Sequence, residues 1–517
     1  MNPYVQYMYS YPHKTAYRPL EGVCLDEYAG LLAGKGHGLY LHVPFCQGKC
    51  GYCNLFSVTG QDAQAIERYL DGVERQSRQY QELLMPYGTE FSEFTIGGGT
   101  PLLLSGEQLE GMFALVRRHF ALEEGAQIGI ETAPNQTERG KLELLKQEGV
   151  CRVSMGIQSF FDEELGTLRR GHRANQAREA LGMLMSMGFP RVNVDFIYGI
   201  PGQTVDSLQA SLREAVGFGV DEIFLYPLYV KHGAGLVQEG VVIDPEYAYL
   251  QYREMCGYLR AEGFRQDSMR RFVRKRGRKA QKAYLRENGG NDDVREAHLR
   301  GNGGNDDVRE AHLRENGGND DEWRKEKREF SECGFGTSLA LGCGGRSYVG
   351  MLHFCTPYAV TQESCLEQLR RFEATADFSK VQHGILLSEE EQRRRYVIRH
   401  LLIRPGIALR RYEEAFGSPV LEDFPVLKEW TEKGWLQEEE AGDAYGREKD
   451  ELRTEAAGAS NKGKTPECFL TLTEEGMGLS DYLGPMLASG EVWGKMKEWE
   501  AVYEPRGGFL SGEPEKL

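Results

Sequence analysis

Residues 38–56 read GLYLHVPFCQGKCGYCNLF, an apolar stretch that runs straight into three closely spaced cysteines. The first six residues have the pattern of a buried strand, and Cys46, Cys50 and Cys53 then fall within eight residues. A structural zinc site normally takes four thiolate or imidazole ligands, and a redox dithiol takes two. Three cysteines directly after a strand therefore indicate a metal centre that keeps one position open.

Outward from this loop, short apolar strands alternate with longer amphipathic helices. Strands that are buried on both faces and alternate with helices form a parallel sheet. Six such units of about 30 residues each predict an α/β fold built on a partial (β/α)6 barrel. A doubly wound open sheet is the competing topology, because periodicity alone does not separate the two. The strands are predicted at 38–43, 94–98, 128–132, 152–157, 192–199 and 222–227, with helices between them, for example at 62–84 and 204–218.

The cysteine spacing suits an iron–sulfur cluster. Soft thiolates select iron–sulfur, zinc or copper(I), and a CxxxCxxC loop lets three thiolates each bind one iron of a [4Fe–4S] cluster. The fourth iron then has no protein ligand and can bind a small molecule through an amine and a carboxylate. The alternatives are a zinc knuckle completed by His42, or plain buried thiols. Tyr52 can place an aromatic ring beside such a centre.

Polar or glycine-rich groups stand at the ends of four consecutive predicted strands. Three consecutive glycines at 97–99 let a backbone approach a ligand and expose N–H donors. Glu131, Gln158 and Asp195 each interrupt an apolar strand, which is costly unless a partner satisfies them. Each could be a structural hydrogen bonder. Barrel enzymes keep their ligands at the C-terminal strand ends, so together these groups predict a binding site there.

The bulk composition limits the possible partners and location. The formal net charge of −16 disfavours a general affinity for nucleic acid, because phosphate binding needs a basic surface. The 11 cysteines are scattered apart from the loop, which differs from a dense disulfide framework. The N-terminus lacks the pattern of a signal peptide, and no apolar run approaches the ~20 residues of a membrane span. We expect a cytoplasmic protein with no membrane span and no nucleic acid partner.

Together these motifs resemble the radical S-adenosylmethionine (radical SAM) enzymes, and more narrowly the oxygen-independent coproporphyrinogen III oxidase-like family with its heme chaperone branch. The match covers roughly Tyr40 to Tyr229, with a weaker one over residues 342–350 and the C-terminal domain. The segments that carry it are LYLHVPFCQGKCGYCNLFS (39–57), IGGGTP (96–101), RVSMGIQSF (152–160), LRRGH (168–172), DFIYGIPGQT (195–204) and LYPL (225–228).

The resemblance implies a set of site residues and cofactors. It implies that Cys46, Cys50 and Cys53 hold a [4Fe–4S] cluster, with S-adenosylmethionine as the second cofactor. The reduced cluster would cleave S-adenosylmethionine to a 5′-deoxyadenosyl radical. It further implies a small organic substrate and a low-potential electron donor such as flavodoxin or ferredoxin. The implied contacts of S-adenosylmethionine are Tyr40, Tyr52, Gly98, Gly99, Thr100, Glu131, Gln158, Arg170, Asp195 and Ile197.

This sequence departs from the motifs of both branches of the family at one place each. Coproporphyrinogen oxidases of this type carry a further cysteine two residues after the third ligand, where this chain has Leu55. The heme chaperone branch carries an HNxxYW motif, which this sequence lacks. We expect a radical SAM oxidoreductase that acts on an organic substrate, porphyrin-related or of another class. The competing classes are a heme-binding chaperone with little catalysis and a zinc-bearing scaffold.

The domain organisation follows from changes in composition. We expect an N-terminal extension (1–35), the core barrel (36–270), an insertion (271–330), a core-associated connection (331–385) and a helical C-terminal domain (386–517). The insertion combines a basic stretch with a tandem repeat of period 14, LRENGGNDDVREAH, which has almost no apolar residues and is expected to be disordered. The C-terminal domain is expected to be winged-helix-like, with an acidic low-complexity gap near 437–466.

Overall fold

The fold is built around six parallel strands that occur in the sheet in the same order as in the chain. The computed structural model describes residues 2–8, 10–229, 234–238, 241–275, 336–440 and 467–503, so the 14-residue repeat and most of the acidic gap lie outside the described residues. Each strand pairs in parallel with the next. The strands are β2 (His37–Val43), β5 (Glu90–Gly98), β6 (Ala121–Thr132), β7 (Arg152–Gln158), β8 (Arg191–Tyr198) and β9 (Glu222–Pro227).

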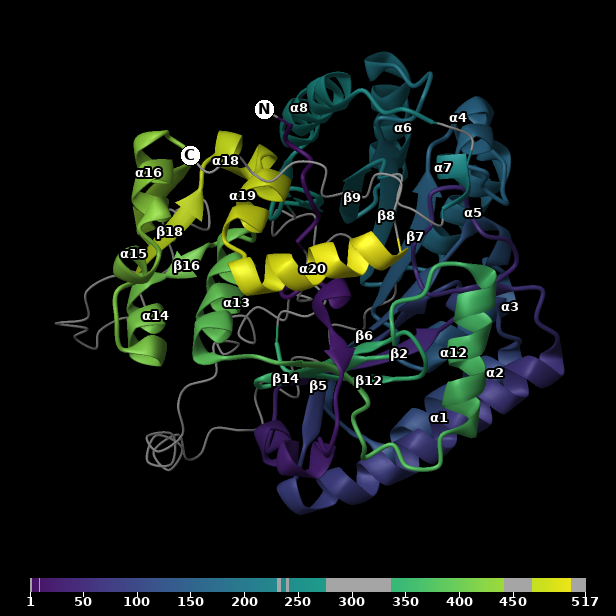
Figure 1. Cartoon of the computed structure of the whole chain (residues 1–517). Helices are drawn as coiled ribbons and strands as arrows, with labels where there is room; N and C mark the ends of the chain where they lie inside the picture. Colours follow the sequence, from purple (N-terminus) through teal and green to yellow (C-terminus); the bar gives the residue numbers. More distant parts are fainter. Residues whose placement is uncertain are drawn as a thin grey trace, which may run out of the picture.

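This strand order confirms the predicted partial (β/α)6 barrel. A doubly wound sheet reverses its strand order at a switch point, whereas here successive strands are neighbours throughout. The helices that follow the strands pack buried apolar residues against the sheet, and Figure 1 shows α1 and α2 running along one side of it. They are α1 (Ala63–Leu84), α2 (Gly106–His119), α3 (Arg139–Gln147), α5 (Ala174–Ser186), α6 (Val205–Phe218) and α8 (Pro245–Ala261).

Helix boundaries follow local capping chemistry. The Asp62 side chain accepts the backbone N–H of Ala65 at 2.8 Å and begins α1. Ser105 and Gln108 form a reciprocal capping box at the start of α2. Gly219, in the left-handed conformation at φ 85°, ends α6. The first two caps fix where α1 and α2 begin, and Gly219 fixes where α6 ends.

Short strands from outside the six barrel strands extend the sheet to 13 strands. On one side β12 (Ser338–Leu341) pairs in parallel with β2, and β13 (Arg346–Val349), β14 (Leu352–Cys355), β15 (His383–Leu386) and β1 (Arg18–Pro19) follow. On the other side β11 (Arg271–Arg274) pairs with β9, and β10 (Phe264–Gln266) pairs with β11. The predicted boundary at residue 270 therefore falls between two paired strands of one sheet. Helix α12 (Gln362–Ala374) packs against α1.

The C-terminal region forms its own small core of helices and a three-stranded antiparallel sheet, consistent with the predicted helical, winged-helix-like domain. Figure 1 shows this region beside the barrel, with α20 running between the two. Among the described residues, no helix is long and apolar enough to cross a membrane. The elements are α13 (Glu389–Leu401), β16 (Ile407–Ala408), α14 (Leu409–Phe416), α15 (Val420–Asp423), α16 (Val426–Glu432), β17 (Leu436–Glu440), β18 (Cys468–Leu472), α18 (Glu474–Gly478), α19 (Ser480–Met486) and α20 (Gly490–Tyr503).

Candidate functional site

One large cavity of about 1060 Å³ occupies the interior of the open barrel and reaches the C-terminal strand ends. It gathers every site residue that the sequence singles out, although these residues come from separate elements. The residues that line it include Tyr40, Cys46, Cys50, Tyr52, Cys53, Gly98, Gly99, Thr100, Glu131, Gln158, Arg170, Asp195 and Ile197. The predicted clustering at one rim therefore matches the geometry, while the role of each residue stays a prediction.

The cysteine loop packs directly on the glycine-rich end of β5. The backbone N–H groups of Gly99 and Thr100 donate to the carbonyls of Val43 and Phe45, each at 2.8 Å. A Cβ atom at position 99 would lie 2.6 Å from the Phe45 oxygen and 3.0 Å from the Cys46 sulfur. Only glycine therefore allows this close approach. The glycine run fixes where the cysteine loop leaves the strand.

The three thiols are free and partly buried. Burial raises the pKa of Cys46 to about 11 and also raises the pKa of Cys53. Because metal ligation requires thiolates, these sulfurs need a cationic partner to deprotonate at neutral pH. A cationic iron centre would supply that partner.

His42 is already engaged and does not complete a four-ligand knuckle. Its Nε2 donates to the Phe56 carbonyl at 2.9 Å, and its Nδ1 lies 3.2 Å from the Tyr40 hydroxyl. Burial lowers the pKa of His42 to about 4, so the ring is neutral. Among the described residues, no group of three or more His, Cys, Asp or Glu side chains is placed to hold a single metal ion. A cluster differs, because each of its thiolates binds a separate iron.

Arg170 brings a cation from the opposite side of the cavity to the cysteine loop. It follows α4 (Asp162–Thr167) in a loop that folds back over the end of β7. Its Nη1 donates to the Cys50 sulfur at 3.1 Å and to the Tyr52 hydroxyl at 3.4 Å, and its Nη2 donates to the Gly156 carbonyl at 2.5 Å. A planar, permanently charged guanidinium in this position is suited to a carboxylate ligand.

Two carboxyl groups, those of Glu131 and Asp195, line the same cavity as Arg170. Glu131 is accessible from the cavity but enclosed by protein, and this desolvation raises its pKa to about 7, although Gly98 donates an N–H to Oε2 at 3.1 Å. Desolvation likewise raises the pKa of Asp195 to about 6, against the stabilising hydrogen bond from Asn193 at 2.8 Å. Both groups are thus poised to respond to a ligand that brings N–H or O–H donors.

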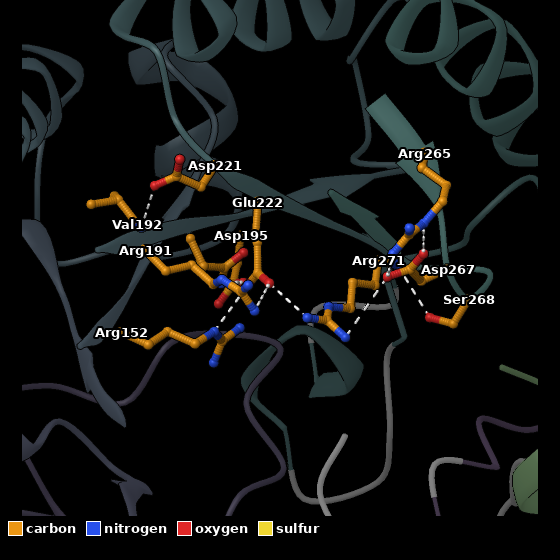
Figure 2. Close-up of polar contacts among 11 residues, drawn as sticks. Arg152, Arg191, Val192, Asp195, Asp221, Glu222, Arg265, Asp267, Ser268 and Arg271 are labelled. Carbon is orange, nitrogen blue, oxygen red and sulfur yellow. Dashed lines mark hydrogen bonds and ion pairs between the residues drawn. The ribbon is translucent and has the colours of Figure 1, made fainter. Parts of the chain in front are cut away.

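Below this rim the barrel interior stays polar. Figure 2 shows Glu222, fully buried on β9, surrounded by Arg152, Arg191 and Arg271, whose nitrogens lie at 2.8, 3.2 and 2.7 Å. Burial alone would raise the pKa of Glu222, but the three guanidinium charges hold it well below its usual value. This network binds the starts of β7, β8, β9 and β11 together, and Arg152 and Arg271 also line the cavity.

Several cavity residues were not singled out from the sequence. Tyr7 and Lys14 reach the cavity from the N-terminal segment, and Arg346 reaches it from β13. No periodic pattern marks them, because they come from short segments that join the barrel only through tertiary packing. His172 also lines the cavity, and its position within the LRRGH motif was the available signal.

Comparisons with known proteins agree on one family. Residues 40–215 match the model of the radical SAM superfamily. The chain is 35% identical over 240 residues to a heme chaperone HemW from Mycobacterium tuberculosis, covering 45% of this chain and 61% of the relative. It is 29% identical over 219 residues to an oxygen-independent coproporphyrinogen III oxidase from Paracoccus denitrificans, covering 42% of this chain and 48% of the relative. The matched segment thus spans about half to three fifths of these relatives.

A solved structure extends the likeness of fold beyond that segment. Coproporphyrinogen III oxidase (HemN) from Escherichia coli superposes with a TM-score of 0.67, covering 95% of this chain and 96% of that chain at 19% identity. At this identity the match supports the architecture alone.

The superfamily whose model matches residues 40–215 uses a [4Fe–4S] cluster and S-adenosylmethionine, the same two cofactors that the sequence motifs predict. The donor set fits them. Three soft thiols, a buried guanidinium that lies 3.1 Å from one of their sulfurs, and two titratable carboxyls share one cavity. Thiolates suit iron, the guanidinium suits a carboxylate, and the carboxyls suit hydroxyl or ammonium groups.

Proposed function

Because residues 40–215 of this chain match the model of the radical SAM superfamily, we propose that the protein is a radical SAM oxidoreductase acting on a small organic molecule. Cys46, Cys50 and Cys53 hold the [4Fe–4S] cluster. The chemistry supplied by the two cofactors is reductive cleavage of S-adenosylmethionine to a 5′-deoxyadenosyl radical that can take a hydrogen atom from a substrate. The observation that carries the proposal is the convergence of all thirteen predicted residues on one cavity.

In this proposal the chain's own residues orient S-adenosylmethionine through complementary charges. Arg170 pairs with the methionine carboxylate, because its guanidinium is fixed by the Gly156 carbonyl and points toward the cysteine loop. Glu131 and Asp195 accept hydrogen bonds from the amino group or the ribose hydroxyls. The backbone at Gly98, Gly99 and Thr100 lies close enough to the loop to serve the same ligand.

The other walls of the cavity enclose the reaction and bind the substrate. Tyr7, Lys14 and Arg346 face the interior from segments outside the six-stranded barrel. Lys14 Nζ lies 4.0 Å from the ring centre of Tyr358, which holds a cation against an aromatic wall. Exclusion of bulk water here protects a reactive radical from side reactions. The electron for S-adenosylmethionine cleavage comes from a low-potential donor such as flavodoxin or ferredoxin.

The test combines cofactor analysis with product analysis. After anaerobic reconstitution, the wild-type protein should bind iron and sulfide, show thiolate-to-iron absorption and release 5′-deoxyadenosine on reduction. Changing Cys46, Cys50 and Cys53 to Ala should abolish all three. The matched control changes the partly buried Cys24, Cys151 and Cys468 to Ala and should retain them. Full iron and sulfide content in the first triple variant would contradict the assignment of the ligands.

Mass spectrometry then addresses the substrate. Cells are grown on deuterated medium, and their extract is incubated anaerobically with the reduced enzyme. The 5′-deoxyadenosine that forms is then examined for deuterium. Transfer of deuterium identifies a hydrogen-donating substrate class, because the hydrogen that the radical takes remains on the nucleoside.

A heme-binding chaperone is the second candidate, and the relatives named heme chaperone HemW favour it. Leu55 also favours it, since this cavity residue stands where coproporphyrinogen oxidases carry a further cysteine. Heme titration of the reconstituted protein separates the candidates. Tight stoichiometric heme binding without 5′-deoxyadenosine release would support the chaperone, and release without heme binding would support the oxidoreductase.

A further inference from the structure

Two neighbouring side chains on the inner face of β8 are joined by a hydrogen bond. Successive side chains of a strand point to opposite faces, so Asn193 and Asp195, two positions apart, share one face, and both line the cavity. Asn193 Nδ2 donates to Asp195 Oδ1 at 2.8 Å. The register places Asn193 beside Ser154 of β7 and Glu222 of β9, one layer deeper in the barrel than Asp195.

This hydrogen bond fixes which way the Asn193 amide points. An ionised carboxylate only accepts, so the NH2 group of the amide faces Asp195 and its oxygen Oδ1 points elsewhere. Asn193 is 2% exposed, and within the part of the chain that the structure describes its Oδ1 has no hydrogen-bond partner. Most buried polar side chains are satisfied by the fold. An amide whose donor end alone is used, on a neighbour that also lines the cavity, therefore points to a role in the site.

Asp195 needs this donor because its charge is poorly solvated. Desolvation raises the pKa of Asp195 to about 6, and the hydrogen bond from Asn193 opposes this rise more strongly than either nearby guanidinium does. The charged or titratable groups that surround Asp195 come from several elements: Arg152 (β7), Arg170 (the loop after α4), Glu222 (β9), Glu131 (β6) and Tyr52 (the cysteine loop).

We propose that Asn193 is a positioning residue of the S-adenosylmethionine site, whose amide orients the Asp195 carboxylate toward the ligand and stabilises its charge. This inference rests on the proposed function, because it requires Asp195 to accept hydrogen bonds from S-adenosylmethionine. A carboxylate has two oxygens, and holding Oδ1 leaves Oδ2 to accept from an amino or hydroxyl group of the ligand. Asn193 thus acts on the ligand through Asp195.

Two variants of similar shape remove the donor. Asn193→Leu keeps the branched side chain but makes no hydrogen bond. Asn193→Asp replaces the donor by a second carboxyl group, which disfavours the charge of Asp195 still more. Ser154→Ala is the matched control, because Ser154 is buried beside Asn193 and lines the same cavity, and among the described residues no hydrogen bond joins it to Asp195.

The measurement is equilibrium binding of S-adenosylmethionine to reconstituted protein between pH 5 and pH 8.5, with iron content from the same preparation. All variants carry Glu131→Gln, which removes the neighbouring carboxyl group that titrates in the same range. In this background, affinity should fall below a midpoint near pH 6 as Asp195 is protonated.

Asn193→Leu should raise this midpoint by about one pH unit, because a hydrogen bond to a charged group is worth at least that much. Binding should then be about fivefold weaker at pH 6 but within about threefold of the background at pH 8.5. Asn193→Asp should raise the midpoint further, and Ser154→Ala should leave it in place. An unchanged midpoint in either Asn193 variant that retains its iron would overturn the proposal.

A double-variant cycle tests whether Asn193 acts through Asp195. In the Asp195→Ala background, Asn193→Leu should cause no further loss of affinity, because the group that it orients is gone. An undiminished further loss would overturn the proposal by showing that Asn193 contacts the ligand itself. Failure of the proposed function looks different: the wild-type protein would then fail to bind S-adenosylmethionine.

Discussion

Arg170 is the residue on which ligand affinity should depend most. Arg170→Ala removes a charged, bidentate partner, so we expect affinity for S-adenosylmethionine to fall by ~2–3 kcal/mol, or roughly 30- to 150-fold. Iron content should stay unchanged, because Arg170 contacts the Cys50 sulfur without being a ligand of iron. Arg173→Ala is the matched control from the same loop, because the Arg173 side chain is 81% exposed and its ion pair with Asp162 is long, at 3.8 Å.

Asp195→Asn should have a milder effect, since Asn keeps one acceptor and the same shape. The opposing view is that Arg170 and Asp195 hold the barrel together. If they do, both variants should lose iron and thermal stability together. Wild-type affinity for S-adenosylmethionine in Arg170→Ala would contradict the binding role of Arg170.

We expect Glu131 to make ligand binding dependent on pH. With a pKa of about 7, Glu131 is mostly neutral at pH 6 and mostly ionised at pH 8. If the ionised form accepts hydrogen bonds from S-adenosylmethionine, affinity should fall up to about tenfold between pH 8 and pH 6. Glu131→Gln should bind more weakly and lose this slope, which isothermal titration at several pH values can measure. An unchanged slope in Glu131→Gln would assign the titration to another group.

The raised pKa of Glu131 has the opposite effect on the folding stability of the ligand-free protein, which decreases as the pH rises. The folded pKa of Glu131 lies above its ordinary value of 4.5, so the fold favours the protonated form. This contribution is fully present below pH 4.5 and is lost as the pH rises toward 7. Ligand binding and folding thus compete for the charge state of one carboxyl group.

At the residue scale, the sequence predicted best those groups that break an apolar strand pattern. Glu131 and Asp195 interrupt β6 and β8, and the cysteines stand directly after β2, so spacing alone places them at one rim. His172 was not predicted as a site residue, because its contact with the Ile157 carbonyl depends on the bulge at the end of β7, and a bulge has no reliable signature in a single sequence. Lys14 and Arg346 were not predicted as cavity residues, because only tertiary packing brings their segments to the cavity.

Gly99 connects the end of β5 with the cysteine loop. An Ala side chain at this position would meet the Phe45 carbonyl at 2.6 Å, so the loop must move. We expect Gly99→Ala to lower iron content after reconstitution, with loss of iron–sulfide absorption as the measurement.

Gly111→Ala is the matched control, since Gly111 lies within α2 with nothing within 4 Å of its Cβ position. It should retain iron and stabilise the helix by up to about 1 kcal/mol. Equal iron content in the two variants would show that the loop tolerates displacement.

At the element scale, long strands were predictable and short ones were not. The six barrel strands agree with their predicted positions to within a few residues, apart from the longer N-terminal ends of β5 and β6. The strands are bounded by helices and, apart from the N-terminal part of β6, consist mostly of buried and half-buried residues, which gives a strong pattern. Strands β12 to β15 have four residues each, which is too short for a period to emerge. Their pairing with β2 and β1 depends on contacts distant in sequence.

The whole molecule joins the barrel and the C-terminal region through a buried ion pair. Arg270, beside β11, contacts the Asp481 carboxylate in α19, and their side chains are 4% and 2% exposed. Tyr229 also donates to Asp481, and the Arg270 guanidinium lies 3.6 Å from the ring centre of Tyr7. Tyr7 and Tyr229 line the cavity, so the C-terminal region supports one of its walls.

Removing Asp481 should therefore weaken the assembly of the whole molecule. Asp481→Ala leaves Arg270 buried without its carboxylate, which costs about 3–5 kcal/mol for such pairs. Four of the five tryptophans lie between residues 430 and 499, so tryptophan fluorescence during urea unfolding follows the C-terminal region. We expect its transition to shift to lower urea concentration.

Two further variants decide what causes that shift. The double change Arg270→Met with Asp481→Leu replaces the pair by apolar groups of similar volume and should recover most of the stability. Glu498→Ala breaks the exposed Arg18–Glu498 pair, whose side chains are 33% and 74% exposed, and should change stability by no more than about 1 kcal/mol. If Asp481→Ala unfolds at the same urea concentration as Glu498→Ala, the buried pair does not hold the two regions together. If the double variant remains as unstable as Asp481→Ala, packing around α19, rather than an uncompensated charge, causes the loss.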